Sequence, residues 1–300
     1  MTTNAVDKLV FGTGGRFGRL AEREAFDLVD FAYSHGISIY DTGVAYCKGR
    51  SQKLLYKCLL SLDLPRESFS ICTKISVCSL AVNNKSKIID QLFSGFQSQL
   101  SCVDTLMLWG PSLDDLSNLK AFKMVRDLRD DGLIRRVGVN THHAHVMRYL
   151  IDNLDYFSLV DDLMVDFNLL QNGRAEMLRD FKTSRDSRKV WAGTALCQGF
   201  LIQSLLSIYL RTRSFSYLAR ALLNPPTRAY LLKASPVRRL LHKCFGDEYK
   251  RVPLSFLLNS HSVSFVPLGM LSKSSIANNV DIARNPVDKN LIDSFVRKMP

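Results

Sequence analysis

Apolar and polar positions along the chain follow two alternating periods, and this alternation predicts an α/β fold. Short apolar runs have the composition of buried parallel strands: Leu9–Phe11, Ser38–Tyr40, Phe69–Thr73, Thr105–Leu108, Arg136–Val139, Leu163–Phe167, Val190–Ala192 and Ser264–Pro267. Stretches of helical period lie between them: Glu22–His35, Gln52–Ser61, Lys85–Leu100, Asp115–Asp131, His143–Asn153 and Ala175–Ser184. Strands and helices in this order predict a parallel sheet.

The number of strand–helix units narrows the fold further. Eight strand runs in 300 residues favour a closed (β/α)₈ TIM barrel over an open doubly wound sheet. The chain is 46% hydrophobic, which is enough for a large core, and no linker or internal repeat divides it. We therefore expect one barrel domain over residues 1–300, with an insertion at residues 203–251.

Polar residues end several of the apolar runs, and in a TIM barrel such positions hold the catalytic groups. Asp41 ends the second run, Lys74 ends the third, and Tyr46 follows on the loop between them. Tyr has an ordinary pKa of about 10, and a nearby Lys held by an Asp favours its ionised form. The trio is typical of a proton donor for a carbonyl oxygen that receives hydride. The spacing alone fits equally a capping Asp, a packed Tyr and a surface Lys.

The positive charge is concentrated in one segment. The net charge is +12, from 40 basic and 28 acidic residues, and ten of the Lys and Arg lie between Gln203 and Arg251. Three interpretations stay open: a lid that meets the cofactor pyrophosphate and an anionic substrate, a solvated surface with Arg stems over apolar area, or an amphipathic interfacial element. Pro225-Pro226 and Pro236 predict short helices here. Aromatic residues are not interleaved with the cations as in a nucleic-acid-binding module.

Cysteine usage and the N-terminus predict a cytoplasmic protein. The seven cysteines are scattered, odd in number and form no CxxC pair, which is typical of reduced thiols. We find no secretory signal pattern and no apolar run long enough to span a membrane. The cluster of His142, His143 and His145 has no Cys or acidic residue at a zinc spacing, so no metal site is expected.

Eight segments resemble those of the aldo/keto reductase family, in the family's order. They read LVFGTGGRFG, GISIYDTGVAYCKGRSQKLL, CTKIS, VDTLMLWGP, GLIRRVGVNT, VDFNLLQ, ALCQGFL and FVPLGMLSKSSIANNV. The resemblance implies a TIM barrel that binds NADPH or NADH and reduces aldehydes or ketones. It puts Asp41, Tyr46 and Lys74 on the family's catalytic Asp, Tyr and Lys.

The same resemblance implies a cofactor site along the barrel mouth. Backbone N–H groups near Gly269 and a helix that begins near Ser274 would face phosphate. Lys273 is the nearby cation that favours NADP(H) over NAD(H), and Asn279 matches the family's adenine-contacting Asn. The implied cofactor-binding residues are Gly12, Thr13, Gly14, Asp41, Asn140, Thr141, Met164, Gly193, Thr194, Leu196, Gly199, Gly269, Met270, Leu271, Ser272, Ser275 and Asn279.

Three positions depart from the family pattern. Trp109 replaces the family's catalytic His, and its indole N–H can donate a hydrogen bond but cannot titrate. Met164 replaces the Gln that holds the nicotinamide amide, and Gly193 replaces a stacking ring. Two hypotheses follow: a reductase for a small carbonyl compound, anionic or sugar-derived, or a cofactor-binding scaffold with little activity.

Two expectations concern the whole molecule. Trp109 and Trp191 are both expected near the barrel mouth, where bound nicotinamide would quench their fluorescence. The assembly stays open between a monomer and a dimer.

Overall fold

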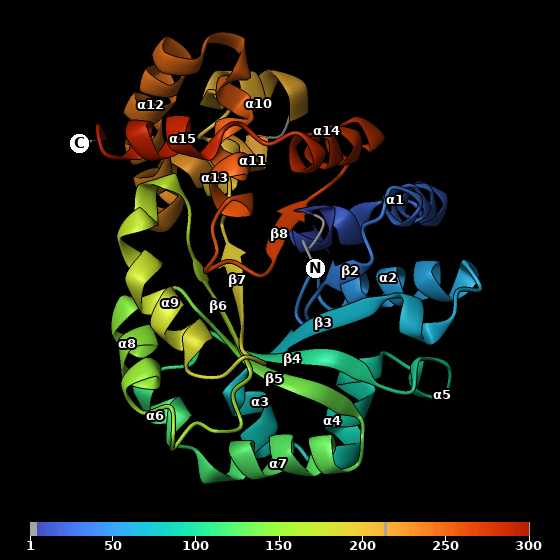
Figure 1. Ribbon diagram of the computed structural model, residues 1–300. Coiled ribbons are helices and arrows are strands. Elements are labelled where there is room, and N and C mark those ends of the chain that lie inside the picture. The colour runs from blue at the N-terminus through green and yellow to red at the C-terminus, as the bar shows by residue number, and fades with distance from the viewer. Residues whose placement is uncertain (1–4, 213–214, 300) are drawn as a thin grey trace.

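The computed structural model describes residues 5–212 and 215–299, and it confirms the predicted barrel (Figure 1). All eight expected strands are present, each shifted by no more than a few residues. Their bounds are β1 Leu9–Gly12, β2 Ile39–Asp41, β3 Ser70–Ile75, β4 Val103–Trp109, β5 Ile134–Thr141, β6 Asp162–Asp166, β7 Lys189–Gly193 and β8 Val266–Gly269.

Every paired strand runs parallel to its neighbour, in the order β7-β6-β5-β4-β3-β2-β1-β8. The two ends of this sheet meet through a single bridge between Trp191 and Phe265. There the Ala192 N–H donates to the Phe265 carbonyl at 2.8 Å. Because all strands point the same way, their carboxyl ends form one mouth, where Asp41, Trp109 and Asn140 lie.

Helices cover the outside of the barrel, and two of the expected ones are divided. The prediction of one helix over Lys85–Leu100 is wrong because Ser94, with φ 51°, ends the first part in a left-handed conformation. The prediction over Asp115–Asp131 is wrong because Asn118 starts a new helix, its side chain accepting from the Ala121 N–H at 3.1 Å. The α-helices outside the insertion are α1 Glu22–Ser34, α2 Arg50–Ser61, α3 Val77–Val82, α4 Lys85–Phe93, α5 Gln97–Leu100, α6 Leu113–Leu116, α7 Leu119–Asp130, α8 Ala144–Asp152, α9 Ala175–Thr183, α13 Val252–Leu258, α14 Lys273–Arg284 and α15 Lys289–Val296.

Short 3₁₀ helices join several of these elements. They are η1 Ala5–Lys8, η2 Phe17–Arg19, η3 Arg66–Ser68, η4 Leu169–Arg174 and η5 Cys197–Gly199. Only η1 precedes β1 among the described residues, so no described strand or α-helix lies ahead of the barrel.

Residues 203–251, the expected insertion, form helices that gather with α13 and α15 on one side of the molecule (Figure 1). They are α10 Leu205–Thr212, α11 Phe215–Leu223, α12 Pro225–Phe245 and the 3₁₀ helix η6 Gly246–Lys250. Of its cations, Arg213 lies outside the described residues, and the side chains of Arg211 and Arg220 are not described either.

The expected break at Pro236 is wrong, because α12 continues through it. Proline removes one backbone hydrogen bond from a helix interior. Burial of Val237 and Leu241 on the following turns, in a cluster with Phe200, offsets that cost. Pro225 is where a proline is tolerated, at the first position of the helix, and Asn224 caps it by accepting from the Thr227 N–H at 3.2 Å.

Apolar side chains form three clusters. The largest lies between the strands and the outer helices, and a second lies beneath the insertion. The third fills the barrel interior with Val10, Cys72, Met107, Met164 and Trp191. The expectation that Trp191 lies near the mouth is therefore wrong, since its register on β7 puts it inside the barrel.

Candidate active site

Asp41, Tyr46 and Lys74 come together at the mouth. Asp41 is the last residue of β2 and Lys74 the last but one of β3. The Lys74 ammonium donates to the Asp41 carboxylate and, at 3.2 Å, to the Thr42 carbonyl. The Lys74 Nζ lies 5.1 Å from the centre of the Tyr46 ring. Lys74 is only 2% exposed, so these groups interact with little screening by water.

The charges of this trio oppose the effect of burial. Burial raises the pKa of Tyr46 above its ordinary value, and the Lys74 ammonium partly offsets this by lowering it. Burial alone would lower the pKa of Lys74, but the charge of the Asp41 carboxylate and the hydrogen bond to it outweigh this effect, so that pKa is raised. Lys74 is therefore charged and Tyr46 protonated at neutral pH, which is the state that a proton donor requires.

A tight loop after β2 sets the position of Tyr46. The Tyr46 N–H donates to the Gly43 carbonyl at 3.0 Å, and its own carbonyl accepts from the N–H groups of Gly49 and Ser51. A Cβ atom at Gly43 would lie 3.3 Å from the Tyr46 ring, closer than most such contacts. Glycine at this position lets the ring lie directly over the loop and beside Lys74.

Trp109 forms a wall next to Tyr46. It is the last residue of β4, and its ring meets the Tyr46 ring edge to face, with centres 5.8 Å apart and an interplanar angle of 90°. Its side chain is still 36% exposed. The indole of Trp109 thus borders the space above the Tyr46 ring. Its N–H can donate a hydrogen bond but does not titrate.

The ends of β1 and β8 form a cradle of bare backbone. Gly12 and Gly269 are paired in register, and a Cβ atom at Gly12 would come within 3.0 Å of the Leu268 carbonyl. A Cβ atom at Gly269 meets nothing within 4 Å, so the backbone there is open. Helix α14 starts directly after this cradle, at Lys273, one residue before the expected start.

Hydroxyl groups surround the first turn of α14. Ser272 caps the helix by accepting from the Ser275 N–H at 3.1 Å, and its hydroxyl lies 3.0 Å from that of Ser274. The Lys273 ammonium lies 5.5 Å from the centre of the Phe31 ring on α1. Open glycine backbone, serine hydroxyls and a helix N-terminus together fit a phosphate group. Just before the helix, Met270 is buried and Leu271 is half-buried, and within the helix Asn279 is buried.

Other predicted cofactor residues lie between these two regions. The Thr13 hydroxyl and N–H both donate to the Asp41 carbonyl, at 3.1 and 2.8 Å, which fixes the β1–β2 edge of the mouth. A Cβ atom at Gly14 would lie 3.7 Å from the Tyr46 ring. The Asn140 amide donates to the Met164 carbonyl at 3.3 Å.

Thr141 and Met164 lie on the neighbouring strands β5 and β6. The Thr141 hydroxyl accepts from the His143 N–H at 3.1 Å. The Met164 side chain packs in the barrel interior and provides no hydrogen-bond donor.

Asp166 organises a hydrogen-bond network that the sequence did not predict. Its carboxylate accepts from the Thr194 hydroxyl, the Tyr230 hydroxyl and His142 Nδ1, each at 2.9 Å. Tyr230 belongs to α12, so the network ties the insertion to the ends of β5, β6 and β7. Asp166 lies within the predicted strand run Leu163–Phe167, whereas nothing in the sequence points to Tyr230, 64 residues away.

The turn after β7 supports this network. Thr194 has a positive φ of 51°, and its carbonyl accepts from the Asn168 amide at 3.1 Å. It follows Gly193, the last residue of β7. Leu196 and Gly199 close the next turn, since the Gly199 N–H donates to the Leu196 carbonyl at 2.8 Å.

Replacing Asp166 by Asn should loosen the insertion in a pH-dependent way. Burial would raise the pKa of Asp166, but the hydrogen bonds from His142, Tyr230 and Thr194 outweigh it and lower that pKa. The bond to Asp166 raises the pKa of His142. We expect Asp166→Asn to lower the free energy of unfolding by about 1–3 kcal/mol, because partners are left poorly paired.

The sign of the pH dependence follows from the two shifts. The contribution of Asp166 is lost as pH falls through its lowered pKa, and that of His142 is lost as pH rises through its raised pKa. The penalty for Asp166→Asn, measured by urea unfolding, should therefore be larger at pH 5.5 than at pH 8. The difference is modest, since the His142 side chain is 53% exposed. His142→Ala is the control that should remove it, and an equal penalty at both pH values would contradict the role of His142.

Two kinds of feature are absent from the described residues. No group of three or more His, Cys, Asp or Glu in residues 5–212 and 215–299 is placed to hold a metal ion. Within the same ranges, no helix combines the length and apolar character needed to cross a membrane.

Comparison with known proteins places these features in context. A model of the aldo/keto reductase family matches residues 8–298. The chain is 28% identical over 176 residues to D-arabinose 1-dehydrogenase of Saccharomyces cerevisiae, covering 52% of this chain and 51% of that protein. It is 26% identical over 147 residues to L-galactose dehydrogenase of Arabidopsis thaliana, covering 47% and 46%. The matched stretches thus span about half the length of these curated relatives.

Solved structures share the fold. An aldo/keto reductase from Klebsiella pneumoniae, in complex with NADP and acetate, superposes with a TM-score of 0.71 at 16% identity, covering 97% of this chain and 90% of that one. An aldo-keto reductase from Bacillus halodurans in its holo form gives a TM-score of 0.71 at 17% identity, with 97% and 91% covered. At this identity the likeness establishes the barrel architecture.

Proposed function

The chain belongs to the aldo/keto reductase family, and from that premise we propose that it catalyses NAD(P)H-dependent reduction of an aldehyde or ketone, or the reverse oxidation of an alcohol. The observation that supports this most is the buried Lys74–Asp41 pair set against the Tyr46 ring. A chain kept only as a scaffold has no need for a buried ion pair beside a protonated phenol at an open mouth.

In the proposed mechanism, Tyr46 is the general acid. Its hydroxyl gives a proton to the carbonyl oxygen of the substrate as negative charge develops there. The Lys74 ammonium stabilises the phenolate that results, and Asp41 holds that ammonium in place and charged. The indole of Trp109 borders the same space and would orient the carbonyl through its N–H. A nicotinamide cofactor, when bound, supplies the hydride.

The cofactor would lie across the mouth of the barrel, from the ends of β8 and β1 to the end of β5. The cradle of Gly12 and Gly269 and the N-terminus of α14 would hold its phosphates, and Lys273 would favour NADP(H) over NAD(H). Asn140 and Thr141 would hydrogen-bond the nicotinamide amide, because Met164 has no amide group with which to do so. The NADP complex of the Klebsiella pneumoniae structure supports this proposal.

The substrate proposed is a hydroxylated carbonyl compound that is sugar-derived or anionic. Two curated relatives are named as sugar dehydrogenases. The insertion would act as its lid. Two of its cations have partners within the fold: Arg238 donates to the Phe200 carbonyl, and Arg251 donates to the Asp281 carboxylate. Arg228, Lys233 and Lys243 make no described ion pair and are exposed, so they remain for an anion. Unpaired thiols support a cytoplasmic location.

A titration followed by an assay tests this function. NADPH should quench the fluorescence of Trp109 at the mouth, more strongly than NADH at equal concentration, and Trp109→Phe should remove the quench. NADPH oxidation should then be faster with D-glucuronate than with neutral glyceraldehyde, and salt should reduce that preference. If a cofactor quenches the fluorescence but is not oxidised with any carbonyl compound, the hypothesis of a cofactor-binding scaffold replaces this one. If neither cofactor quenches it, the proposed cofactor site is wrong.

A further inference from the structure

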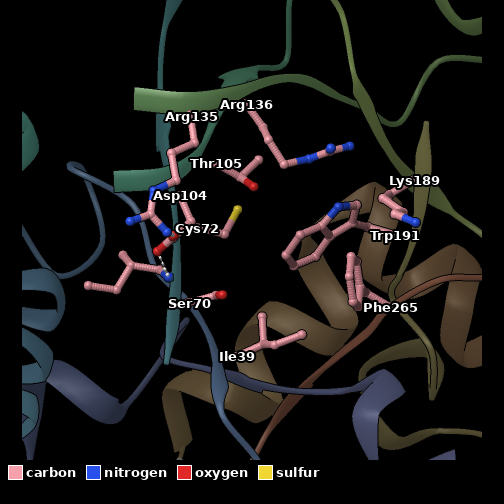
Figure 2. Close-up of a pocket in the computed structure, with 11 residues that line it drawn as sticks. Ile39, Ser70, Cys72, Asp104, Thr105, Arg135, Arg136, Lys189, Trp191 and Phe265 are labelled. Carbon is pink, nitrogen blue, oxygen red and sulfur yellow. Dashed lines mark hydrogen bonds and ion pairs between the residues drawn. The ribbon is translucent and has the colours of Figure 1, made fainter. Parts of the chain in front are cut away.

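A cavity lies at the opposite end of the barrel from Tyr46. It has a volume of about 280 Å³. The residues around it come from the amino ends of the strands: Ile39 opens β2, Lys189 opens β7, and Phe265 directly precedes β8. Figure 2 shows these side chains around a shared space. Nothing in the proposed reductase mechanism uses this end of the barrel.

One side of the cavity is apolar and aromatic. The rings of Trp191 and Phe265 have their centres 4.6 Å apart, and Ile39 lies across from them (Figure 2). Surfaces of this kind bind planar rings by offset or edge contacts. The volume corresponds to about nine water molecules, which suits a one-ring compound with a short substituent.

The same cavity contains a buried donor without a partner. Trp191 is 2% exposed, and its Nε1–H makes no hydrogen bond among the described residues. The indole nitrogen lies on the edge of the ring that faces Arg136 in Figure 2. Buried polar groups in native proteins are nearly always hydrogen-bonded, so an acceptor is expected here.

The charge balance around the cavity is positive. Asp104 is shared between Arg66 at 2.6 Å and Arg135 at 2.8 Å, and Asp162 pairs with Arg136 at 2.5 Å. Both carboxylates are therefore neutralised within the fold. Lys189 makes no ion pair within residues 5–212 and 215–299, which leaves its ammonium available at the rim.

We propose that this basal cavity binds a small planar aromatic carboxylate. The ring would lie against Trp191, Phe265 and Ile39, and one carboxylate oxygen would accept from the Trp191 indole N–H. The other oxygen would pair with the Lys189 ammonium. An anion provides an acceptor for the Trp191 N–H and a counter-charge for the Lys189 ammonium. An unsubstituted neutral ring provides neither. The site is separate from the mouth and independent of the reductase function.

Nuclear magnetic resonance of the two indole N–H groups tests this directly, with benzoate as the probe. Trp109→Phe assigns the two signals. We expect benzoate to shift the Trp191 signal saturably and to leave the Trp109 signal in place. Benzamide, which has the same ring without the charge, should bind at least tenfold more weakly. Lys189→Gln should weaken benzoate binding at least tenfold.

Lys87→Gln is the matched control, since it removes the same charge from an exposed lysine on α4, and it should leave benzoate binding unchanged. The proposal is overturned if benzoate leaves the Trp191 signal unmoved at tens of millimolar. It is also overturned if benzamide binds equally well, if Lys189→Gln has no effect, or if only the Trp109 signal moves. NADPH should move the Trp109 signal alone, so failure here is distinguishable from failure of the reductase proposal.

Discussion

Tyr46→Phe is expected to lower kcat for carbonyl reduction by about 100- to 10,000-fold, the range for loss of a general acid. The substitution removes the only atom that gives the proton and keeps the ring that packs against Trp109 and over the Gly43 turn. Cofactor affinity should therefore be retained. Single-turnover kinetics with NADPH, together with its Kd from Trp109 fluorescence, separate the two quantities.

Tyr149→Phe is the control for this experiment, because Tyr149 lies on the outer helix α8 and is 38% exposed. Its kcat should equal that of the unmodified protein. If Tyr46→Phe keeps its kcat within a fewfold, the proton comes from another group and the proposed mechanism is wrong.

The second large effect is expected from Lys74→Met. It leaves the buried Asp41 carboxylate without its counter-charge, and breaking a buried ion pair on one side costs about 3–5 kcal/mol of unfolding free energy. Urea unfolding measures this loss. Activity should also fall, because the phenolate formed at Tyr46 loses its stabilising cation.

A double variant distinguishes charge from packing. Lys74→Met combined with Asp41→Asn removes both charges, so it should be more stable than Lys74→Met alone. Lys57→Met is the matched control: its partner Glu22 is 69% exposed, and loss of such a surface pair costs about 0–1 kcal/mol. If Lys74→Met costs no more than Lys57→Met, the buried pair does not stabilise the barrel as we infer.

The eight strands and the meeting of Asp41, Tyr46 and Lys74 could be predicted because both depend on local signals. An apolar run that ends in Asp41 or in Lys74 indicates a strand end, and parallel strands bring their ends together. The prediction at Pro236 was wrong because the local effect of proline is outweighed by packing of Val237 and Leu241 against residues from a distant part of the chain. Whether Met164 and Gly193 contact a cofactor stays a prediction.

Positions that depend on register or on long-range contacts were not predictable. Trp191, like Trp109, lies on a predicted strand run or directly after one, yet its place opposite Met164 puts it inside the barrel. Tyr230 reaches Asp166 only because α12 folds back over the strand ends. Contacts of this kind are decided by tertiary packing and leave no periodic signal in the sequence.

The barrel is joined unevenly around its circumference. Strand β8 pairs with β1 along four residues, whereas it meets β7 only through the Trp191–Phe265 bridge and its neighbouring hydrogen bonds. Local opening begins where few hydrogen bonds hold an element, so amide hydrogens such as that of Ala192 should exchange with solvent ahead of those in β4 and β5. The insertion lies between β7 and β8 in the chain, so its two ends connect to the two sides of this seam. A ring bound against Trp191 and Phe265 would stabilise this seam from the amino end of the barrel and slow that exchange.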